Sequence, residues 1–193
     1  MTYIPVSGRT IRRRRESERS TRRLVFVLSS AAVIAWLLSV TLSTAVHVDT
    51  YGHSLAVALH ILSLVVAFGA VILVDWHGFL WLIGRRQLAE VLRLGGAATL
   101  LIWGGLAGLL ATGVFLNPHL NNPLTDLKLA AVLVLSLNGI MLIPLMRRLA
   151  RLPSDASFED LTAGQRIHLL LRLVISQACW WTAIIIGFIN AEF

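Results

Sequence analysis

Five long apolar segments decide what this chain can fold into. They cover residues 24–46, 54–82, 95–116, 126–146 and 167–190. Each is long enough for a helix that crosses the hydrocarbon core of a bilayer, which needs about 20 residues. Because lipid offers the backbone no hydrogen-bond partner, each segment must be helical, and the period-two alternation of barrel strands is absent. The sequence predicts an all-α integral membrane protein with five transmembrane helices.

Composition supports this class and excludes several others. Apolar residues make up 56% of the chain and charged residues 14%, with a mean hydropathy of +0.76. Soluble domains carry about 25% charged residues, so lipid is the expected solvent. The single cysteine, Cys179, rules out an intrachain disulfide, a thiolate metal cluster and a motif for covalent haem attachment.

The arginines predict the orientation of the chain in the membrane. Fifteen of the 17 Lys and Arg residues precede the first span or lie in the second and fourth connections. The first and third connections, 47–53 and 117–125, contain neither Lys nor Arg. By the positive-inside rule, we expect the N-terminus in the cytoplasm and the C-terminus outside. The fifteen are Arg9, Arg12, Arg13, Arg14, Arg15, Arg19, Arg22, Arg23, Arg85, Arg86, Arg93, Arg147, Arg148, Arg151 and Arg166.

Two polar segments flank the spans. Residues 1–22 are rich in Arg and Ser and have little to bury, which predicts a disordered, basic cytoplasmic tail along anionic headgroups. The tail lacks interleaved aromatic residues, so no nucleic-acid partner is expected. The first apolar segment is too long for a secretory signal, and we expect it to be retained. In the connection 151–166, Pro153 predicts a turn that is followed by a short amphipathic helix.

Ionisable side chains within the spans are expensive in hydrocarbon and therefore need a partner or a role. On a helical wheel, those of the second, fourth and fifth spans share inward faces with small residues, so three helices line a common interior. Asp75 and Arg172 lie at similar depth near the basic ends of their spans. The sequence predicts a structural ion pair between them, which would set the helix register.

A second layer of polar side chains lies toward the arginine-free ends of the spans. Depth along the helices predicts that His60 and Lys128 converge there. His47, His53 and His119 make the same end rich in imidazole, a common metal ligand. One hypothesis is a haem-type iron site at His60. The alternative is copper handling from the outer face by His47, His53, His119 and His60.

The third span is rich in glycine, including Gly104 and Gly108. Small residues at this spacing allow a neighbouring helix to pack closely. They equally allow a flat macrocycle to approach the backbone. Together with an inward His60 at similar depth, the second interpretation predicts a slot for a porphyrin.

Two motifs resemble a known superfamily. One is Leu59-His60-Ile61-Leu62-Ser63-Leu64, continuing through Phe68-Gly69-Ala70 toward Arg85-Arg86, and the other is Leu127-Lys128-Leu129-Ala130-Ala131-Val132-Leu133. They resemble small bacterial membrane proteins that include copper-resistance D proteins and the haem-binding, non-flavin protoporphyrinogen oxidase. The resemblance covers about residues 54–190, a four-helix core bundle, to which this chain adds one N-terminal helix. Asn138 stands where that oxidase carries a second histidine.

The resemblance implies a b-type haem with His60 as an axial ligand and Lys128 as a contact to a haem or substrate carboxylate. Ser63 would accept a hydrogen bond from the second ring nitrogen of His60, and Gly104 and Gly108 would line the slot. The expected function is electron transfer, another oxidoreductase reaction, or haem and porphyrin handling, with other membrane redox proteins or a second copy as partners. No catalytic residue is identified. A non-catalytic accessory subunit remains the third hypothesis.

Overall fold

The chain is helical from one end of the bundle to the other in the computed structural model. The structure describes the backbone of residues 8–118, 120 and 122–192, and the side chains of 16–118, 120 and 122–190. The elements are α1 (Gly8–Ala45), α2 (Thr50–Leu82), α3 (Leu88–Gly113), α4 (Pro123–Leu149), the 3-10 helix η1 (Phe158–Asp160) and α5 (Ala163–Glu192). Five helices are long and apolar enough to cross a membrane, so the predicted fold class is confirmed for this part of the chain.

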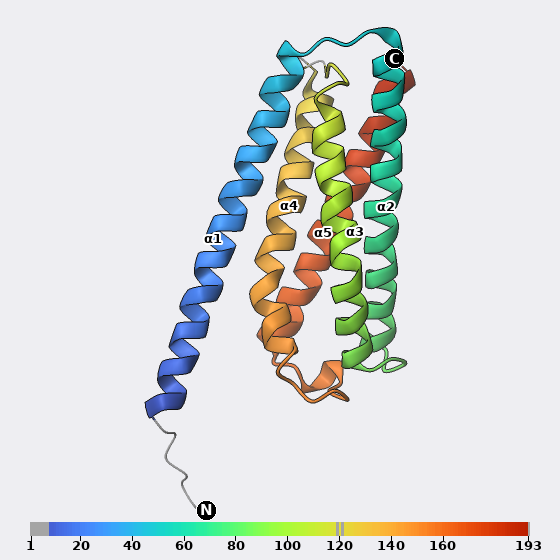
Figure 1. Cartoon of the computed structure of the whole chain (residues 1–193). Helices are drawn as coiled ribbons and strands as arrows, with labels where there is room; N and C mark the ends of the chain where they lie inside the picture. Colours follow the sequence, from blue (N-terminus) through green and yellow to red (C-terminus); the bar gives the residue numbers. More distant parts are fainter. Residues whose placement is uncertain (1–7, 119, 121, 193) are drawn as a thin grey trace, which may run out of the picture.

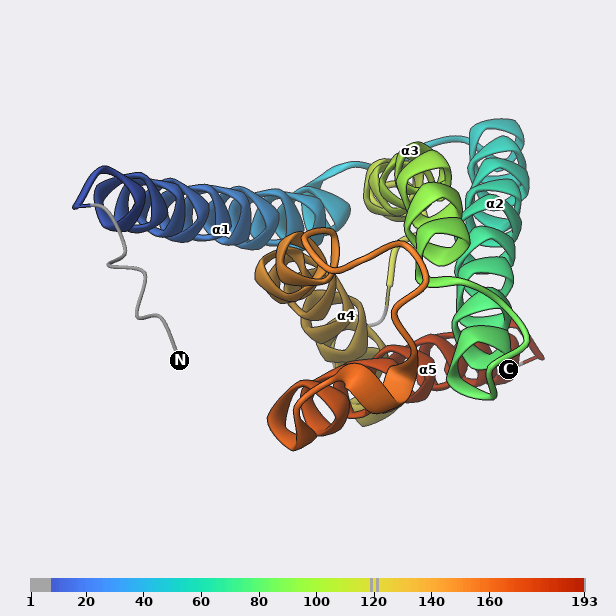
Figure 2. The same ribbon diagram turned by 90° about the horizontal axis from the view of Figure 1, so that it is seen from below.

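The helices are arranged as two hairpins with α1 alongside. Helix α2 packs against α3, α4 packs against α5, and α1 contacts α4 and α3. Figure 1 shows α2 to α5 running side by side, with α1 diverging from them toward the N-terminus. Viewed along the bundle, α1 stands outside the other four (Figure 2). The structure therefore has the predicted form of a four-helix core with one added N-terminal helix.

One apolar cluster in the middle of the bundle joins the two hairpins. Ala67 and Val71 of α2, Leu106 of α3, Leu135 of α4 and Trp180 of α5 are all buried and in contact. Most other large apolar side chains face outward: Phe26, Leu100 and Phe188 are 73%, 79% and 70% exposed. Exposure of so much apolar surface is unfavourable in water, whereas lipid chains solvate it.

The two ends of the bundle differ in charge, and they are named here accordingly. The arginine-rich end contains the connections 83–87 and 150–162, and the arginine-free end contains the connections 46–49 and 114–122. At the arginine-rich end, the Trp81 indole donates to the Ala156 carbonyl at 2.9 Å. Trp81 belongs to a second buried cluster with Leu88 and Leu149, which fastens the α4–α5 connection beneath the bundle.

The α4–α5 connection is more compact than predicted. Instead of a short amphipathic helix, it contains the three-residue η1, and α5 already begins at Ala163. The Asp160 carboxylate accepts hydrogen bonds from the Ser157 backbone N–H at 2.8 Å and from the Ser157 hydroxyl at 2.9 Å. These bonds, the backbone one first, lower the pKa of Asp160. A single capped turn therefore takes the place of the predicted helix.

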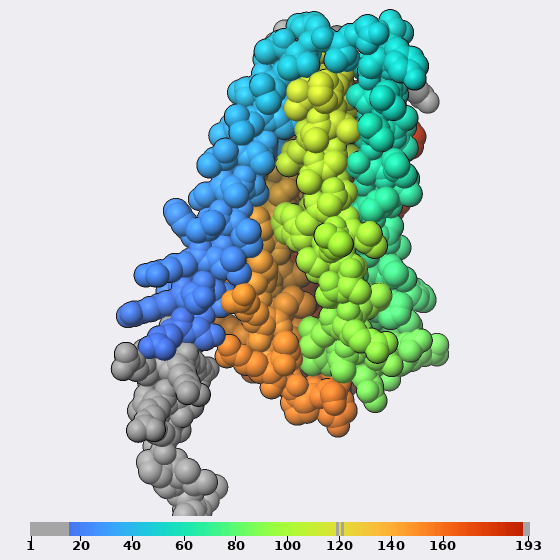
Figure 3. Space-filling view, in the orientation of Figure 1, coloured from blue at the N-terminus to red at the C-terminus, as the bar shows by residue number. Residues whose placement is uncertain are grey.

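Residues 8–22, for which the sequence predicts disorder, lie within α1, which begins at Gly8. Once the apolar span is helical, each added residue gains a backbone hydrogen bond without a new nucleation step. The extension also has side-chain contacts, since Arg147 donates to the Thr21 hydroxyl at 2.7 Å and Arg151 to that of Ser17 at 3.2 Å. In the space-filling view (Figure 3), other long side chains of α1 project away from the bundle.

Candidate functional site

His60 lies on α2 near the arginine-free end, against α3. Its Nδ1 atom is 2.8 Å from the Thr112 hydroxyl oxygen. That hydroxyl donates its one proton to the Gly108 carbonyl, one turn earlier in α3, at 2.6 Å. For both contacts to be hydrogen bonds, Nδ1 of His60 must carry a proton and donate it to Thr112. The Nε2 atom of a neutral His60 is then unprotonated.

This tautomer leaves His60 with a free lone pair on Nε2. Among the described residues, the structure gives Nε2 no hydrogen-bond partner. An imidazole that is held through Nδ1–H and presents Nε2 is the form that ligates a metal. Ser63, the predicted acceptor for the second nitrogen, does not have this role, because Thr112 occupies that position. The sequence analysis did not identify Thr112, because its contact with His60 depends on how α2 and α3 are rotated about their axes.

Lys128 of α4 lies close enough to His60 for the two side chains to interact electrostatically. Both residues lie toward the arginine-free ends of their helices, as their positions in the sequence predict. Both residues are only partly exposed. Neither has an Asp or Glu partner within ion-pair distance among the residues that the structure describes. The site therefore combines an imidazole acceptor with an ammonium group that has no internal counter-ion.

Helix α1 borders this site, although the resemblance covers only the other four helices. The Trp36 indole donates to the Leu129 carbonyl of α4 at 2.9 Å, and the Ser39 hydroxyl donates to the Leu110 carbonyl of α3 at 2.7 Å. A Cβ atom placed on Gly113 would lie 3.8 Å from Ser39 Oγ and 3.9 Å from His60 Cε1. The first span is therefore part of the site's wall.

Two glycines of α3, Gly105 and Gly108, pack against α2, so the predicted slot is not present at Gly108. A Cβ atom on Gly108 would overlap the Ser63 hydroxyl and lie 3.0 Å from Ser63 Cβ. On Gly105 it would lie 2.6 Å from Ala67 Cβ and 2.7 Å from the Ser63 carbonyl oxygen. Gly104 has open space beside it, with nothing within 4 Å. Since Gly104 is exposed, this space is on the outer surface of α3, and Ser63 is a packing residue.

The predicted ion pair between Asp75 and Arg172 is not formed. Asp75 accepts a hydrogen bond from Gln177 at 2.6 Å, whereas Arg172 donates to the Asn138 side-chain oxygen at 3.1 Å. Gln177 is five residues beyond Arg172 in α5, which amounts to about 7.5 Å along the axis and a rotation of roughly 140°. The face of α5 that meets α2 therefore carries Gln177, and Arg172 faces α4.

The other predicted metal ligands are spread out. His53 Nδ1 contacts the Phe115 carbonyl oxygen at 3.2 Å, and His47 is exposed in the α1–α2 connection. His119 lies outside the described residues. Within those residues, no group of three or more His, Cys, Asp or Glu side chains is placed to hold a metal ion. The four histidines predicted to handle copper are therefore not shown to gather around one metal position within the described residues.

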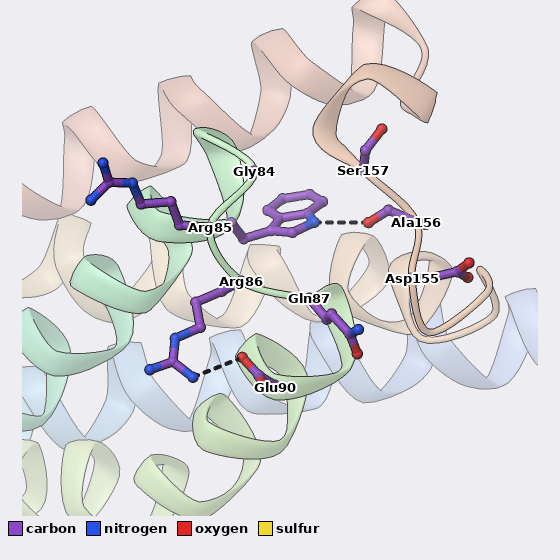
Figure 4. Close-up of a pocket in the computed structure, with 9 residues that line it drawn as sticks. Gly84, Arg85, Arg86, Gln87, Glu90, Asp155, Ala156 and Ser157 are labelled. Carbon is purple, nitrogen blue, oxygen red and sulfur yellow. Dashed lines mark hydrogen bonds and ion pairs between the residues drawn. The ribbon is translucent and has the colours of Figure 1, made fainter.

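A separate cleft of about 440 Å³ opens at the arginine-rich end. Figure 4 shows the Trp81 indole bonded to Ala156 at its base and Arg86 paired with Glu90. Asp155 and Ser157 border the other side, and both arginines extend away from them (Figure 4). Arg85 and Asp155 also line this cleft, which is far from His60 along the bundle.

Comparison of the chain with protein-family models, curated proteins and solved structures finds no match. The candidate site is therefore defined by its geometry and by the two motifs around His60 and Lys128.

The hydrogen bond from His60 to Thr112 leads to a prediction about the His60 tautomer. With Thr112→Val, Nδ1 loses its acceptor, and we expect nitrogen NMR of histidine-labelled protein in detergent to show His60 shifting from the Nδ1–H to the Nε2–H form. Thr112→Ser keeps the hydroxyl and should leave the spectrum unchanged. The His60→Gln variant assigns the signal. An unshifted His60 signal in the valine variant would show that Thr112 does not set the tautomer.

Proposed function

We propose that this chain is a membrane-embedded b-type haem protein with a redox or porphyrin-handling role. The observation that carries the proposal is the couple of His60 and Lys128, in which an imidazole presents an unprotonated Nε2 beside an ammonium group without a carboxylate partner. A haem carries both an iron that takes an imidazole ligand and carboxylates that pair with cations. Haem b therefore matches both members of the couple.

The residues present fit such a group in distinct roles. His60 would bind the iron through Nε2, and Thr112 would hold the ring in that orientation. Lys128 would pair with a propionate. When bound, the haem would supply one-electron chemistry. The protein would bind the cofactor, orient it and exclude water, since the surrounding helices expose apolar surface to lipid.

Membership of the superfamily that contains copper-resistance D proteins and the haem-binding oxidase belongs to the same proposal. It rests on the two motifs and on the spatial approach of their His and Lys. The partners would be other membrane redox proteins or a second copy. An oxidoreductase activity of this chain is part of the same proposal.

A visible spectrum tests the proposal directly. The protein is purified in mild detergent, and the reduced-minus-oxidised difference spectrum is recorded. A Soret band with sharp α and β bands is expected for haem b. A colourless preparation that contains copper would instead support copper handling by the histidines at the arginine-free end. A colourless, metal-free protein that remains folded would support an accessory role.

We also propose that the arginine-rich end lies in the cytoplasm of a bacterial cell and that the protein resides in its plasma membrane. In a Cys179→Ser background, a cysteine at the exposed Thr50 should react with an impermeant thiol reagent on intact cells. A cysteine at the exposed Asp155 should react only after permeabilisation. The reverse labelling pattern would invert the orientation.

A further inference from the structure

Arg172 of α5 is a charged side chain within a span that is surrounded by neutral groups. Its guanidinium donates to the Asn138 oxygen at 3.1 Å and contacts Met141 Sδ at 3.7 Å and His168 Nε2 at 3.4 Å. Among the described residues, no Asp or Glu lies within ion-pair distance of it. A guanidinium carries five N–H donors, and these contacts with Asn138, Met141 and His168 occupy four of them, which leaves one N–H of Nη2 free as well as the charge.

The position of Arg172 is built by the fold. Asn138 is 5% exposed and bonds Arg172 in two places, since its side-chain nitrogen donates to the Arg172 carbonyl at 2.9 Å and its oxygen accepts from the guanidinium. A buried amide with two such contacts has little freedom to rotate. The guanidinium is therefore held at the junction of α4 and α5.

This junction opens toward lipid. Met141 is 45% exposed, and Leu171 and Val174, which flank Arg172 in α5, are 53% and 61% exposed. His168 is exposed as well. A charge that is held at such a surface faces the molecules of the bilayer, whose anionic groups are the phosphates of the headgroups.

The depth of the guanidinium agrees with a headgroup partner. Side chains of a helix lean toward its N-terminus, which for α5 is the arginine-rich end, and Arg172 reaches back to His168. His168 is only two residues, or about 3 Å, beyond Arg166. Arg166 in turn bonds the Leu161 carbonyl of the α4–α5 connection at 2.9 Å, outside the span. The guanidinium thus lies just below the membrane surface.

We infer that the surface around Arg172, at the junction of α4 and α5 near the arginine-rich end, binds the phosphate of an anionic phospholipid such as phosphatidylglycerol. Arg172 donates to a phosphate oxygen through its free Nη2–H and attracts the phosphate by its charge, Asn138 positions the guanidinium, and His168 borders the phosphate. The lipid supplies the counter-ion that the protein lacks at this position. This lipid site is separate from the candidate haem site, and its existence does not depend on haem.

The test measures lipid binding by the full chain. Delipidated protein in detergent is titrated with phosphatidylglycerol, phosphatidylcholine or inorganic phosphate, and bound lipid is counted by native mass spectrometry. We expect wild type to prefer phosphatidylglycerol and inorganic phosphate not to compete with it. Arg172→Gln should weaken phosphatidylglycerol binding about five-fold, the change that corresponds to about 1 kcal/mol for one basic residue near the headgroups. Arg148→Gln, which removes an exposed arginine at the same end, should bind as wild type does.

A second variant keeps Arg172 and gives it a carboxylate counter-ion within the protein. His168→Asp places a carboxylate one turn from Arg172, at the spacing that favours an ion pair. Since His168 is exposed, this variant should fold, and it should lose phosphatidylglycerol binding to a similar extent. The inference is overturned if either Arg172→Gln or His168→Asp binds phosphatidylglycerol as wild type does. It is equally overturned if Arg148→Gln loses as much binding, or if inorganic phosphate displaces the lipid.

Discussion

Replacing His60 with alanine is expected to abolish the Soret band of the purified protein, or to shift it strongly, while the five helices remain inserted. The substitution removes the Nε2 lone pair that would ligate the iron, but it changes none of the apolar surface in contact with lipid. Haem content per protein, from the visible spectrum and a pyridine haemochrome assay, measures the effect. Wild-type absorbance in this variant would contradict the haem assignment.

His77→Ala is the matched control on the same helix. His77 lies about 25 Å further along α2, by a rise of 1.5 Å per residue, and its Nδ1 atom contacts the Leu73 carbonyl oxygen at 3.0 Å. It faces neither Thr112 nor Lys128, so its loss should leave the spectrum unchanged. A loss of haem from both variants would indicate a general defect in α2.

Lys128→Met separates the two possible roles of the ammonium group. If Lys128 pairs with a propionate, the variant should still form the band but lose haem more quickly on dilution, because one charge contact is missing and the iron ligand remains. If Lys128 only extends toward the headgroups, haem retention should equal that of wild type. Time courses of haem transfer to an apoprotein acceptor distinguish the two.

The second large effect concerns the contact between α2 and α3. With Gly105→Ala, the new Cβ atom would lie 2.6 Å from Ala67 Cβ, 2.7 Å from the Ser63 carbonyl oxygen and 2.9 Å from the Ala67 backbone nitrogen. Two of these three are backbone atoms, so the helices must move apart. Overpacking of this kind typically costs about 1–3 kcal/mol. At roughly 2–4 °C per kcal/mol, thermal unfolding in detergent should begin several degrees earlier.

Gly104→Ala is the adjacent control. It makes the same chemical change one residue earlier in α3, where nothing lies within 4 Å of the new Cβ atom. Alanine is favoured over glycine in a helix by about 1 kcal/mol, so this variant should be as stable as wild type or slightly more stable. Equal destabilisation by both variants would show that the close approach of α2 and α3 is absent.

The two halves of the His60 site differ in how far the sequence could predict them. The approach of His60 and Lys128 follows from counting residues from the ends of two spans, because helical rise converts sequence position into depth. The bond from His60 to Thr112 depends instead on the rotation of α3. Thr112 lies on the same face of α3 as Gly105 and Gly108. Once this face was known to pack against α2, the spacing of the three residues could have indicated that Thr112 points toward α2.

The predicted ion pair at the arginine-rich end was wrong for the same reason, because the sequence gives the depth of a residue but not the rotation of its helix. Asp75 and Arg172 have similar depth, and opposite charges in lipid should attract. Yet Gln177 takes the place beside Asp75, because α5 turns that face toward α2 and presents Arg172 to α4 and Asn138. The depth of a residue in the membrane can be predicted from its own helix. Which neighbouring helix its side chain contacts depends on the rotation of both helices.

By itself, the sequence determined that the chain is a multi-pass helical membrane protein with arginines gathered at one end. These features follow from each segment alone, because an unpaired backbone cannot exist in hydrocarbon and each span must close its own hydrogen bonds. Only the tertiary structure decided that α1 borders the site, that Thr112 sets the His60 tautomer and that Arg172 meets Asn138 of α4 and not Asp75 of α2. In a membrane protein the lipid-facing and the buried surfaces of a helix are equally apolar, so the apolar pattern does not reveal which side a helix turns toward its neighbours.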